Sequence, residues 1–173
     1  MPQSRPALLS VALACASLSA QQISGELKQW HDVVLTFTGP STSESAEPNP
    51  FFNHRLDVTF IKGGRTLVVP GYFAADGNAA ETSATSGDRW RVHFVPDETG
   101  EWTYRVSFRR GPNVAVDSNP LAGQPVAPDG VSGKLTIAPS DKFGRDHRAQ
   151  GTLRYVGNHY LQYGGSKRYF NMK

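Results

Sequence analysis

Hydrophobic residues recur at every second position in several short stretches of this chain of 173 residues. Leu56, Val58 and Phe60 alternate with polar neighbours, which predicts a β-strand with one buried face. A Gly-Gly pair follows, and a two-residue turn there would place Phe60 opposite Leu67 and Val58 opposite Val69. The pattern therefore predicts an antiparallel hairpin.

A second pair of alternating segments covers residues 90–94 and 102–108, with the sequence PDETG between the two. Its simplest pairing is a hairpin in which Phe94 lies opposite Trp102 and Arg91 lies opposite Arg105. Like charges that face each other across a strand pair repel. We therefore expect a carboxylate or an ordered anion beside the two arginines, the alternative being that both guanidinium groups are splayed into water.

Further strands are predicted at Val33–Thr38, at Lys134–Ala138 and near Val114. Segments 39–50 and 111–133, which are rich in Gly, Pro and Ser, separate them as loops. No helical periodicity of useful length is present. Short strands around an aromatic core predict an all-β fold, an immunoglobulin-like antiparallel β-sandwich over roughly residues 23–139, with a small barrel as the alternative.

The first twenty residues differ from the rest of the chain. Arg5 precedes an apolar run, and small residues precede Gln21, which is typical of a secretory signal peptide over residues 1–20. The single cysteine, Cys15, falls inside this segment, so the mature chain would lack a disulfide and a thiolate. Lipid attachment at Cys15 is the less favoured alternative. We expect a secreted or periplasmic protein that no longer contacts the membrane after the signal is removed.

Charge divides the remaining chain near Ser140. Residues 21–140 carry 10 basic and 13 acidic side chains, whereas residues 141–173 carry 7 basic and 2 acidic ones. The second segment contains GTLRYVGNHYLQYGG, which predicts a short β-hairpin tail turning at Gly157 and Asn158, with apolar side chains on both faces. An isolated hairpin is marginally stable in water, so this tail requires a partner surface. The formal charge of +3 is too small to indicate a nucleic-acid partner.

The sequence contains no recognisable catalytic arrangement. Asp97, Glu98 and Glu101 crowd one predicted turn, the five histidines are scattered, and a nucleophile motif is missing. We therefore predict no catalytic residue, no cofactor and no metal ligand. Exposed aromatic side chains could still stack on sugars or form an interface. The candidates for such contacts are Trp30, Tyr72, Phe73, Tyr155, Tyr160 and Tyr163.

Several segments together resemble a known family. They are HDVVLTFTGP, NPFFNHRLDVTF, FVPDETGEWTYRVSF, DGVSGKLTIAPSDKFGRD and GTLRYVGNHYLQYGGSKRYF. Nearly the whole mature chain is similar to the immunoglobulin-like module called domain of unknown function 5060. In that family the module precedes a glycoside-hydrolase-like (β/α)8 barrel of the apiosidase-like type in secreted bacterial proteins. The resemblance implies that catalytic carboxylates belong to the barrel, which is missing from this sequence.

The resemblance favours one function and leaves three alternatives open. It implies a non-catalytic accessory domain that braces a catalytic barrel, with the tail hairpin as the segment that enters and packs against the barrel. The alternatives are a carbohydrate-binding module that uses edge aromatics, an oligomerising structural protein that uses the tail hairpin, and a self-contained enzyme. The identity of the polysaccharide does not follow from the sequence.

Overall fold

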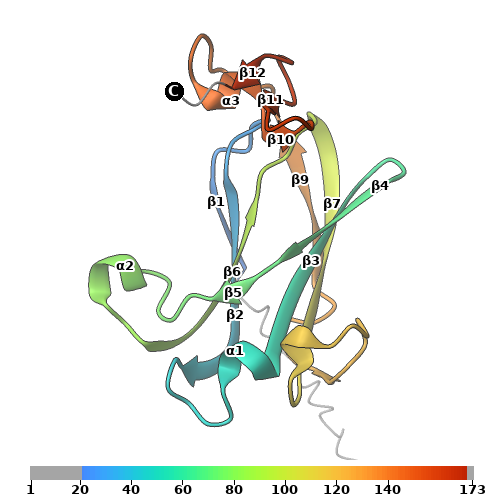
Figure 1. Ribbon diagram of the computed structural model, residues 1–173. Coiled ribbons are helices and arrows are strands. Elements are labelled where there is room, and N and C mark those ends of the chain that lie inside the picture. Colours follow the sequence, from blue (N-terminus) through green and yellow to red (C-terminus); the bar gives the residue numbers. More distant parts are fainter. Residues whose placement is uncertain (1–20, 171–173) are drawn as a thin grey trace, which may run out of the picture.

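The structure is a computed structural model that describes residues 21–170. The predicted signal segment 1–20, Cys15 included, lies outside the described residues. Two antiparallel sheets pack face to face, so the predicted all-β sandwich is confirmed (Figure 1). The first sheet has the strand order β1-β2-β6-β5. Its strands are β1 (Gln22–Gly25), β2 (Val33–Ser43), β6 (Ser86–Phe94) and β5 (Tyr72–Phe73).

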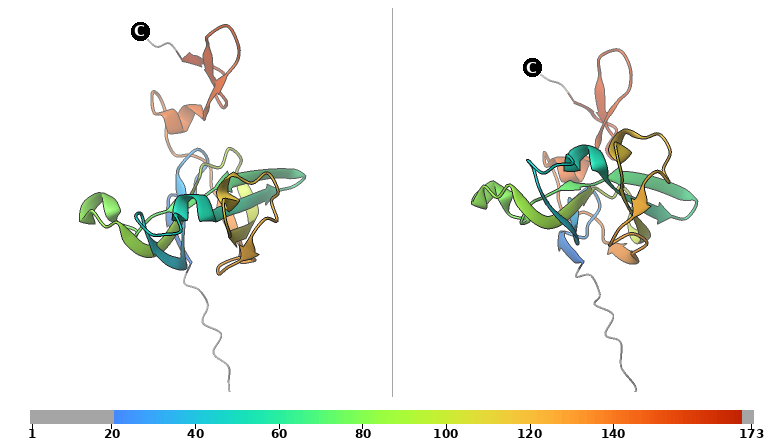
Figure 2. Two further views of the ribbon diagram at one scale, coloured as in Figure 1. Left: turned by 60° about the horizontal axis from the view of Figure 1, so that its bottom comes forward. Right: turned by 90° about the horizontal axis from the view of Figure 1, so that it is seen from below.

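The second sheet has the order β4-β3-β7, and both β8 and β9 pair with the free edge of β7. Its strands are β3 (His54–Lys62), β4 (Arg65–Pro70), β7 (Gly100–Arg110), β8 (Gln124–Pro125) and β9 (Ser132–Ile137). A third, small sheet lies at one end of the sandwich (Figures 1 and 2). We call it the tail sheet, and it consists of β10 (Leu153–Tyr155), β11 (Leu161–Tyr163) and β12 (Tyr169–Phe170).

In the described part of the chain, helical structure is limited to single turns in the connections. These turns are α1 (Pro50–Asn53), α2 (Ala79–Thr82), the 3-10 turn η1 (Val114–Val116) and α3 (His147–Gln150). Within residues 21–170, no helix has both the length and the apolar character needed to span a bilayer.

Aromatic side chains from both sheets fill the core. The ring of Phe60 on β3 stacks on that of Phe94 on β6, with centroids 3.8 Å apart and planes at 7°. Phe94 also meets Trp102 on β7 edge to face, with centroids 5.2 Å apart. All three side chains are buried. Because they come from opposite sheets, they join the two layers of the sandwich.

The first predicted hairpin is confirmed in its register. In the structure, Phe60 pairs with Leu67 and Val58 with Val69 across β3 and β4. The turn consists of Gly63 and Gly64, as the spacing indicated.

The second predicted hairpin is wrong. Strand β6 pairs with β2 and β5, whereas β7 pairs with β3, β8 and β9, so the two strands belong to different sheets. Phe94 and Trp102 do meet, but across the core and not along a ladder. Arg91 lies opposite Thr36 and hydrogen-bonds to the Thr36 hydroxyl and the Gly77 carbonyl, whereas Arg105 lies opposite Thr59. The expected anion between the two arginines therefore has no basis.

The strand predicted near Val114 is also wrong. Asn113 adopts a left-handed conformation (φ 56°), and the 3-10 turn η1 follows and buries the Val114 side chain. The Arg55 guanidinium donates hydrogen bonds to the carbonyls of Val114, Asp117 and Asn119, at 3.0, 2.8 and 3.0 Å. The Arg55 side chain thus fixes the conformation of a loop for which the sequence predicts only turns.

Strand β2 runs past its predicted end at Thr38 to Ser43, with a register shift between Thr38 and Thr42. Gly39 makes this continuation possible. A Cβ atom at this position would lie 2.7 Å from the Trp90 ring and 2.8 Å from the Phe108 ring. Only glycine lets the backbone pass so close to the core aromatics.

We expect His54 to make stability depend on pH. Its ring packs near Trp90 and Phe108, with centroid distances of 5.2 and 6.1 Å, and burial lowers the pKa of His54. The unfolded chain then binds the extra proton first, so this stability is complete above the unfolded pKa near 6.5 and falls as the pH drops below it. The free energy of unfolding, measured in denaturant at pH 7.5 and 5.5, should fall more for the wild type than for His54→Gln.

Glutamine can still donate to the Pro50 carbonyl that His54 contacts at 3.4 Å, so the variant changes titration more than packing. His159→Gln, at an exposed position of the tail, serves as the matched control and should keep the wild-type pH dependence. An equal pH dependence in all three proteins would contradict the role given to His54.

Candidate functional site

The tail sheet lies outside the two packed sheets of the sandwich and is the first candidate for a functional surface. Leu153 pairs with Tyr163 and Tyr155 with Leu161, so the predicted tail hairpin is present. Its loop, however, is centred on Asn158 and is longer than the predicted two-residue turn at Gly157 and Asn158. Three successive residues, Gly157, Asn158 and His159, have positive φ values of 89°, 51° and 64°. The short primed-turn prediction is therefore wrong.

This register places five apolar residues of the tail on one face. Residues directly opposite each other in a ladder point to the same side of a sheet. The apolar tail face consists of Leu153, Tyr155, Leu161, Tyr163 and Phe170. The opposite face carries Arg154, Gln162 and Tyr169. The sequence assigned Leu161 and Tyr163 to the other face, which is wrong and followed from the wrong turn length. Tyr160 does lie on the opposite face, beside Tyr169, with ring centroids 5.9 Å apart.

Trp30 joins the tail to the sandwich. It adopts a left-handed backbone conformation (φ 63°), and its backbone N–H donates a hydrogen bond to the Pro96 carbonyl at 2.7 Å. A bulky side chain rarely adopts this conformation, and here it directs the indole toward the tail. A Cβ atom on Gly165 would lie 2.6 Å from the indole ring, and one on Gly151 would lie 3.2 Å from it. The indole thus packs directly on two stretches of tail backbone.

Asp97 provides a charged link at the same junction. Its carboxylate accepts two hydrogen bonds from the Arg65 guanidinium, at 2.7 and 2.9 Å, and one from Arg154 of β10 at 3.2 Å. Glu98 also pairs with Arg65, at 2.9 Å, and Glu101 pairs with Lys134 at 2.9 Å. The three carboxylates that the sequence grouped in one turn are therefore all engaged in ion pairs. Arg154 is the link that reaches into the tail.

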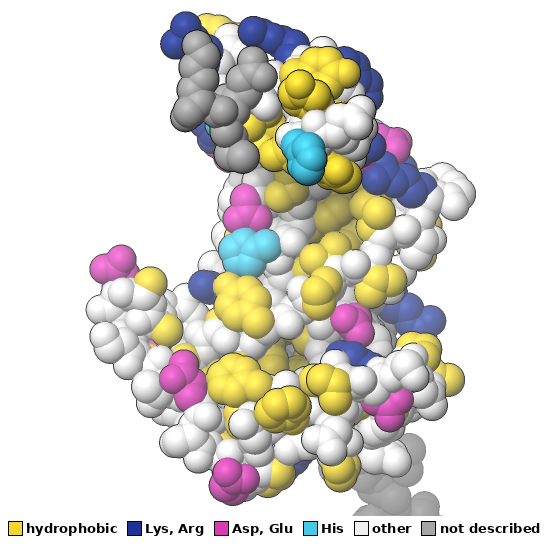
Figure 3. All heavy atoms as spheres, in the orientation of Figure 1, with side chains coloured by type: hydrophobic (Ala, Val, Ile, Leu, Met, Phe, Trp, Pro, Cys, Tyr) yellow, Lys and Arg dark blue, Asp and Glu magenta, His cyan; other side chains and the backbone are white. Residues whose placement is uncertain are grey.

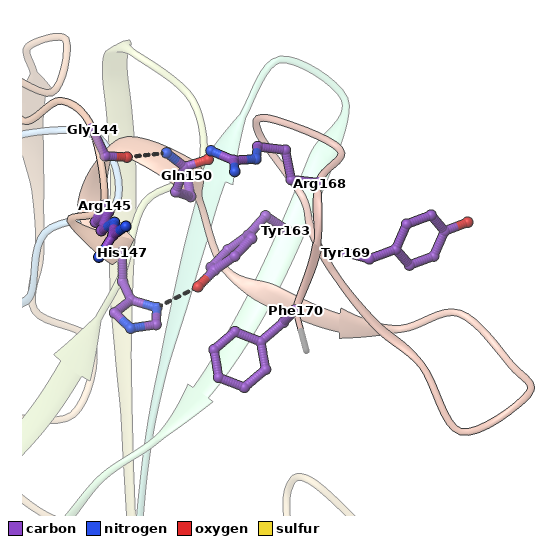
Figure 4. A pocket seen from close by; sticks show the side chains of 8 residues that line it. All are labelled: Gly144, Arg145, His147, Gln150, Tyr163, Arg168, Tyr169 and Phe170. Carbon is purple, nitrogen blue, oxygen red and sulfur yellow. Dashed lines mark hydrogen bonds between the residues drawn. The ribbon is translucent and has the colours of Figure 1, made fainter. Parts of the chain in front are cut away.

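Helix α3 also contacts the tail sheet. Tyr163 and His147 are 2.8 Å apart, from the phenol oxygen to Nδ1, and Phe170 lies beside the same histidine (Figure 4). Gly144, Arg145 and Gln150 complete an open pocket of about 250 Å3 with these tail residues. Asp146 caps α3, and its hydrogen bond from the Arg148 side chain lowers the pKa of Asp146 to about 2.

The aromatic residues chosen from the sequence do not form one platform. Phe73 lies in the core beside Trp90, with ring centroids 5.1 Å apart. Trp30 is half-buried under the tail. Tyr72 is exposed, and its hydroxyl contacts His93 Nε2 at 3.0 Å, while His93 Nδ1 contacts Asp32 at 2.8 Å. In the tail, Tyr155 and Tyr160 are exposed, but Tyr163 is buried. Tyr72 is thus separated from the tail aromatics by its placement on β5.

One group of side chains that could hold a metal ion was not visible from spacing along the sequence. Glu26, His31 and Asp141 place their ligand atoms within 4.8 Å of one another. Glu26 and His31 flank the connection between β1 and β2, but Asp141 follows β9, more than a hundred residues later. Only the fold, which bridges Lys28 to Ala138, brings these segments together.

Part of the sandwich is similar to a described family. Residues 26–109 match Domain of unknown function (DUF5060). The DUF5060 match begins at the residue after β1 and ends one residue before the end of β7, and it includes Trp30 and Asp97. The resemblance drawn from the sequence extended further, over the tail, which this match does not include.

No protein of curated function matches the chain. A solved structure, titled a "putative glycoside hydrolase" from Bacteroides vulgatus ATCC 8482, is similar to the chain at 24% sequence identity with a TM-score of 0.49. The similarity covers 83% of this chain and 21% of that protein. The chain therefore spans about a fifth of the length of that protein.

Proposed function

We propose that this sandwich is a non-catalytic accessory domain of a secreted, carbohydrate-active protein of the glycoside-hydrolase-like class. In this proposal it braces a (β/α)8 catalytic domain, and the apolar tail face forms the contact. The resemblance of the sequence segments to the DUF5060 module motivates the choice of partner. The observation that carries the proposal is the exposed apolar face of an otherwise anchored tail.

The exposure of this face is unequal along its length. Tyr163 is buried against α3 and Leu161 is half-buried, whereas the Tyr155 side chain is 69% exposed. Tyr160, in the adjoining loop, is exposed as well, but its ring lies beside Tyr169 on the opposite face. In the space-filling view, hydrophobic side chains are visible on the tail beside several Lys and Arg side chains (Figure 3). Clustered exposed apolar side chains favour an interaction surface over a solvated one.

Anchoring makes the apolar tail face suitable for bracing a partner. Trp30 and Asp97 attach the tail to the sandwich by packing and by an ion pair, so a partner bound to the tail is held at a fixed position. The strands of the tail sheet contain three, three and two residues. A sheet this small has little core of its own. Burial of its outer face by a partner would stabilise it further.

The test pairs two tyrosines on opposite faces of the tail sheet. The partner is the (β/α)8 domain encoded in the same or the neighbouring reading frame, and its dissociation constant with the full chain is measured by analytical ultracentrifugation. Tyr155→Ser should raise that constant about tenfold or more, as expected for an aromatic residue central to an interface. Tyr169→Ser is the matched control, since Tyr169 is 60% exposed on the opposite face, and it should leave the constant unchanged.

Four outcomes would contradict the proposal. The first is that both tyrosine variants weaken binding of the (β/α)8 domain equally, or that the wild-type chain forms no complex with it. The second is release of reducing ends from mixed glycosides by the chain alone, which would indicate an enzyme. Light scattering that shows self-association sensitive to Tyr155→Ser would indicate an oligomerising protein. Retardation in polysaccharide gels that Tyr72→Ala abolishes would instead favour a carbohydrate-binding module.

A further inference from the structure

His31 is a buried histidine with one unpartnered nitrogen. The residue is 2% exposed and lies just before β2. Its Nδ1 contacts the Gln29 carbonyl at 2.9 Å. A carbonyl oxygen only accepts hydrogen bonds, so Nδ1 carries a proton and donates it. Among residues 21–170, Nε2 has no hydrogen-bond partner.

The unpartnered nitrogen points at two carboxylates. His31 Nε2 lies 3.6 Å from an oxygen of Asp141 and 3.8 Å from an oxygen of Glu26. A buried polar atom without a hydrogen-bond partner is unfavourable. A metal ion between the three groups would give Nε2 a partner, in place of the ammonium groups that now pair with the carboxylates.

We propose that Glu26, His31 and Asp141 bind a divalent transition-metal ion, with zinc as the best-suited probe. One imidazole nitrogen and two carboxylate oxygens are ligands that zinc accepts, and water can complete a tetrahedron. Ligands about 2.0–2.2 Å from zinc lie roughly 3.3–3.5 Å apart in a tetrahedron, so the observed separations from His31 need to shrink by only a few tenths of an ångström. Imidazole favours zinc over magnesium or calcium.

The surroundings of His31 resemble the outer contacts of a metal ligand. A histidine that binds metal through one nitrogen commonly donates its other N–H to a carbonyl or carboxylate, which fixes the ring and its tautomer. The Gln29 carbonyl has this position here. The proton on Nδ1 leaves Nε2 as the ligand atom, on the side where the carboxylates lie.

Lys28 brings the two carboxylates of the site together but also competes with a metal ion for them. Its ammonium nitrogen lies 2.7 Å from Glu26 and 2.6 Å from Asp141, so it holds the two carboxylates together. A metal ion must displace this ammonium or share the carboxylates with it, and the same holds for Lys142, whose ammonium lies 3.1 Å from the Asp141 oxygen that faces His31. Removal of the Lys28 charge should therefore strengthen metal binding.

An ion at this position would connect two parts of the molecule. Glu26 and His31 belong to the connection between β1 and β2, whereas Asp141 belongs to the segment that leads from β9 to α3 and the tail. The ion would fasten the start of that segment to the sandwich, in addition to the contacts of Trp30 and Asp97. This inference does not depend on the proposed partner of the tail.

The experiment is calorimetric titration of the full chain with Zn2+ in a buffer that does not chelate it. We expect one saturable site, and Glu26→Gln or Asp141→Asn should each raise the dissociation constant about tenfold or more, because even loss of an outer contact costs roughly 10–100-fold. Lys28→Gln should lower the constant. Asp32→Asn is the control, since it alters the exposed pair of Asp32 and His93 and should leave zinc binding unchanged.

Cobalt gives a second readout, because its visible absorption reports a tetrahedral site and should be lost in Asp141→Asn. The proposal is overturned if neither the wild type nor Lys28→Gln shows saturable binding. It is also overturned if Glu26→Gln and Asp141→Asn bind zinc as the wild type does. Loss of binding in Asp32→Asn, with binding kept in Asp141→Asn, would place the ion at His93 instead.

Discussion

Phe94→Ala should lower the free energy of unfolding by about 3–5 kcal/mol, the usual range for removing a buried phenylalanine ring from a core. Phe94 is 2% exposed, stacks on Phe60 and meets Trp102 edge to face. Its loss leaves a cavity between the two sheets and removes aromatic contacts with both partners. Denaturant unfolding monitored by tryptophan fluorescence measures the change.

Two further variants show whether this cost comes from the core position. Phe94→Leu keeps much of the volume and should lose less stability than Phe94→Ala, which remains informative if the alanine variant fails to fold. Phe143→Ala removes a ring that is 88% exposed and should change stability by no more than about 0.5 kcal/mol. A cost for Phe143→Ala as large as that for Phe94→Ala would contradict this account of the core.

The same aromatic residues show how far alternation along the sequence can predict the fold. It identified β3, β4, β6 and β7 and the face that each buries, because a period of two is a property of one strand. It could not assign neighbours to β6 and β7. A residue such as Phe94 buries its ring equally well beside Trp102 in one sheet or across the core from it. The tight Gly-Gly turn resolved this ambiguity for β3 and β4, and the five-residue connection PDETG did not.

The candidate site was harder to predict than the fold, for a related reason. Tyr155 and the other tail aromatics were found from composition and from the marginal stability of a lone hairpin. The common face of Tyr155 and Tyr163 depends on a turn centred on Asn158, where a shift by one position exchanges the faces. The group of Glu26, His31 and Asp141 depends on contacts between distant segments, which no local spacing reveals.

Gly165→Ala should release the tail from the sandwich. The added methyl group would lie 2.6 Å from the Trp30 indole and 2.7 Å from the Gln150 carbonyl oxygen, and real Cβ contacts are not this short. Trp30 cannot easily retreat, since its backbone is fixed by the hydrogen bond to Pro96. Overpacking of about 1–3 kcal/mol corresponds to roughly a tenfold to hundredfold rise in the open population. Tryptic cleavage at Arg154 and Lys167 should accelerate to that extent.

Sandwich stability should remain nearly unchanged in this variant, because the tail contributes little to the core, and hydrogen exchange of β7 reports this separately. Gly64→Ala is the matched control: a Cβ there meets no atom within 4 Å, so tryptic cleavage in the tail should keep its wild-type rate. Adding Trp30→Phe to Gly165→Ala should restore only part of the protection, since the Gln150 carbonyl still opposes the methyl group. Unchanged cleavage in Gly165→Ala would mean that Trp30 does not hold the tail in place.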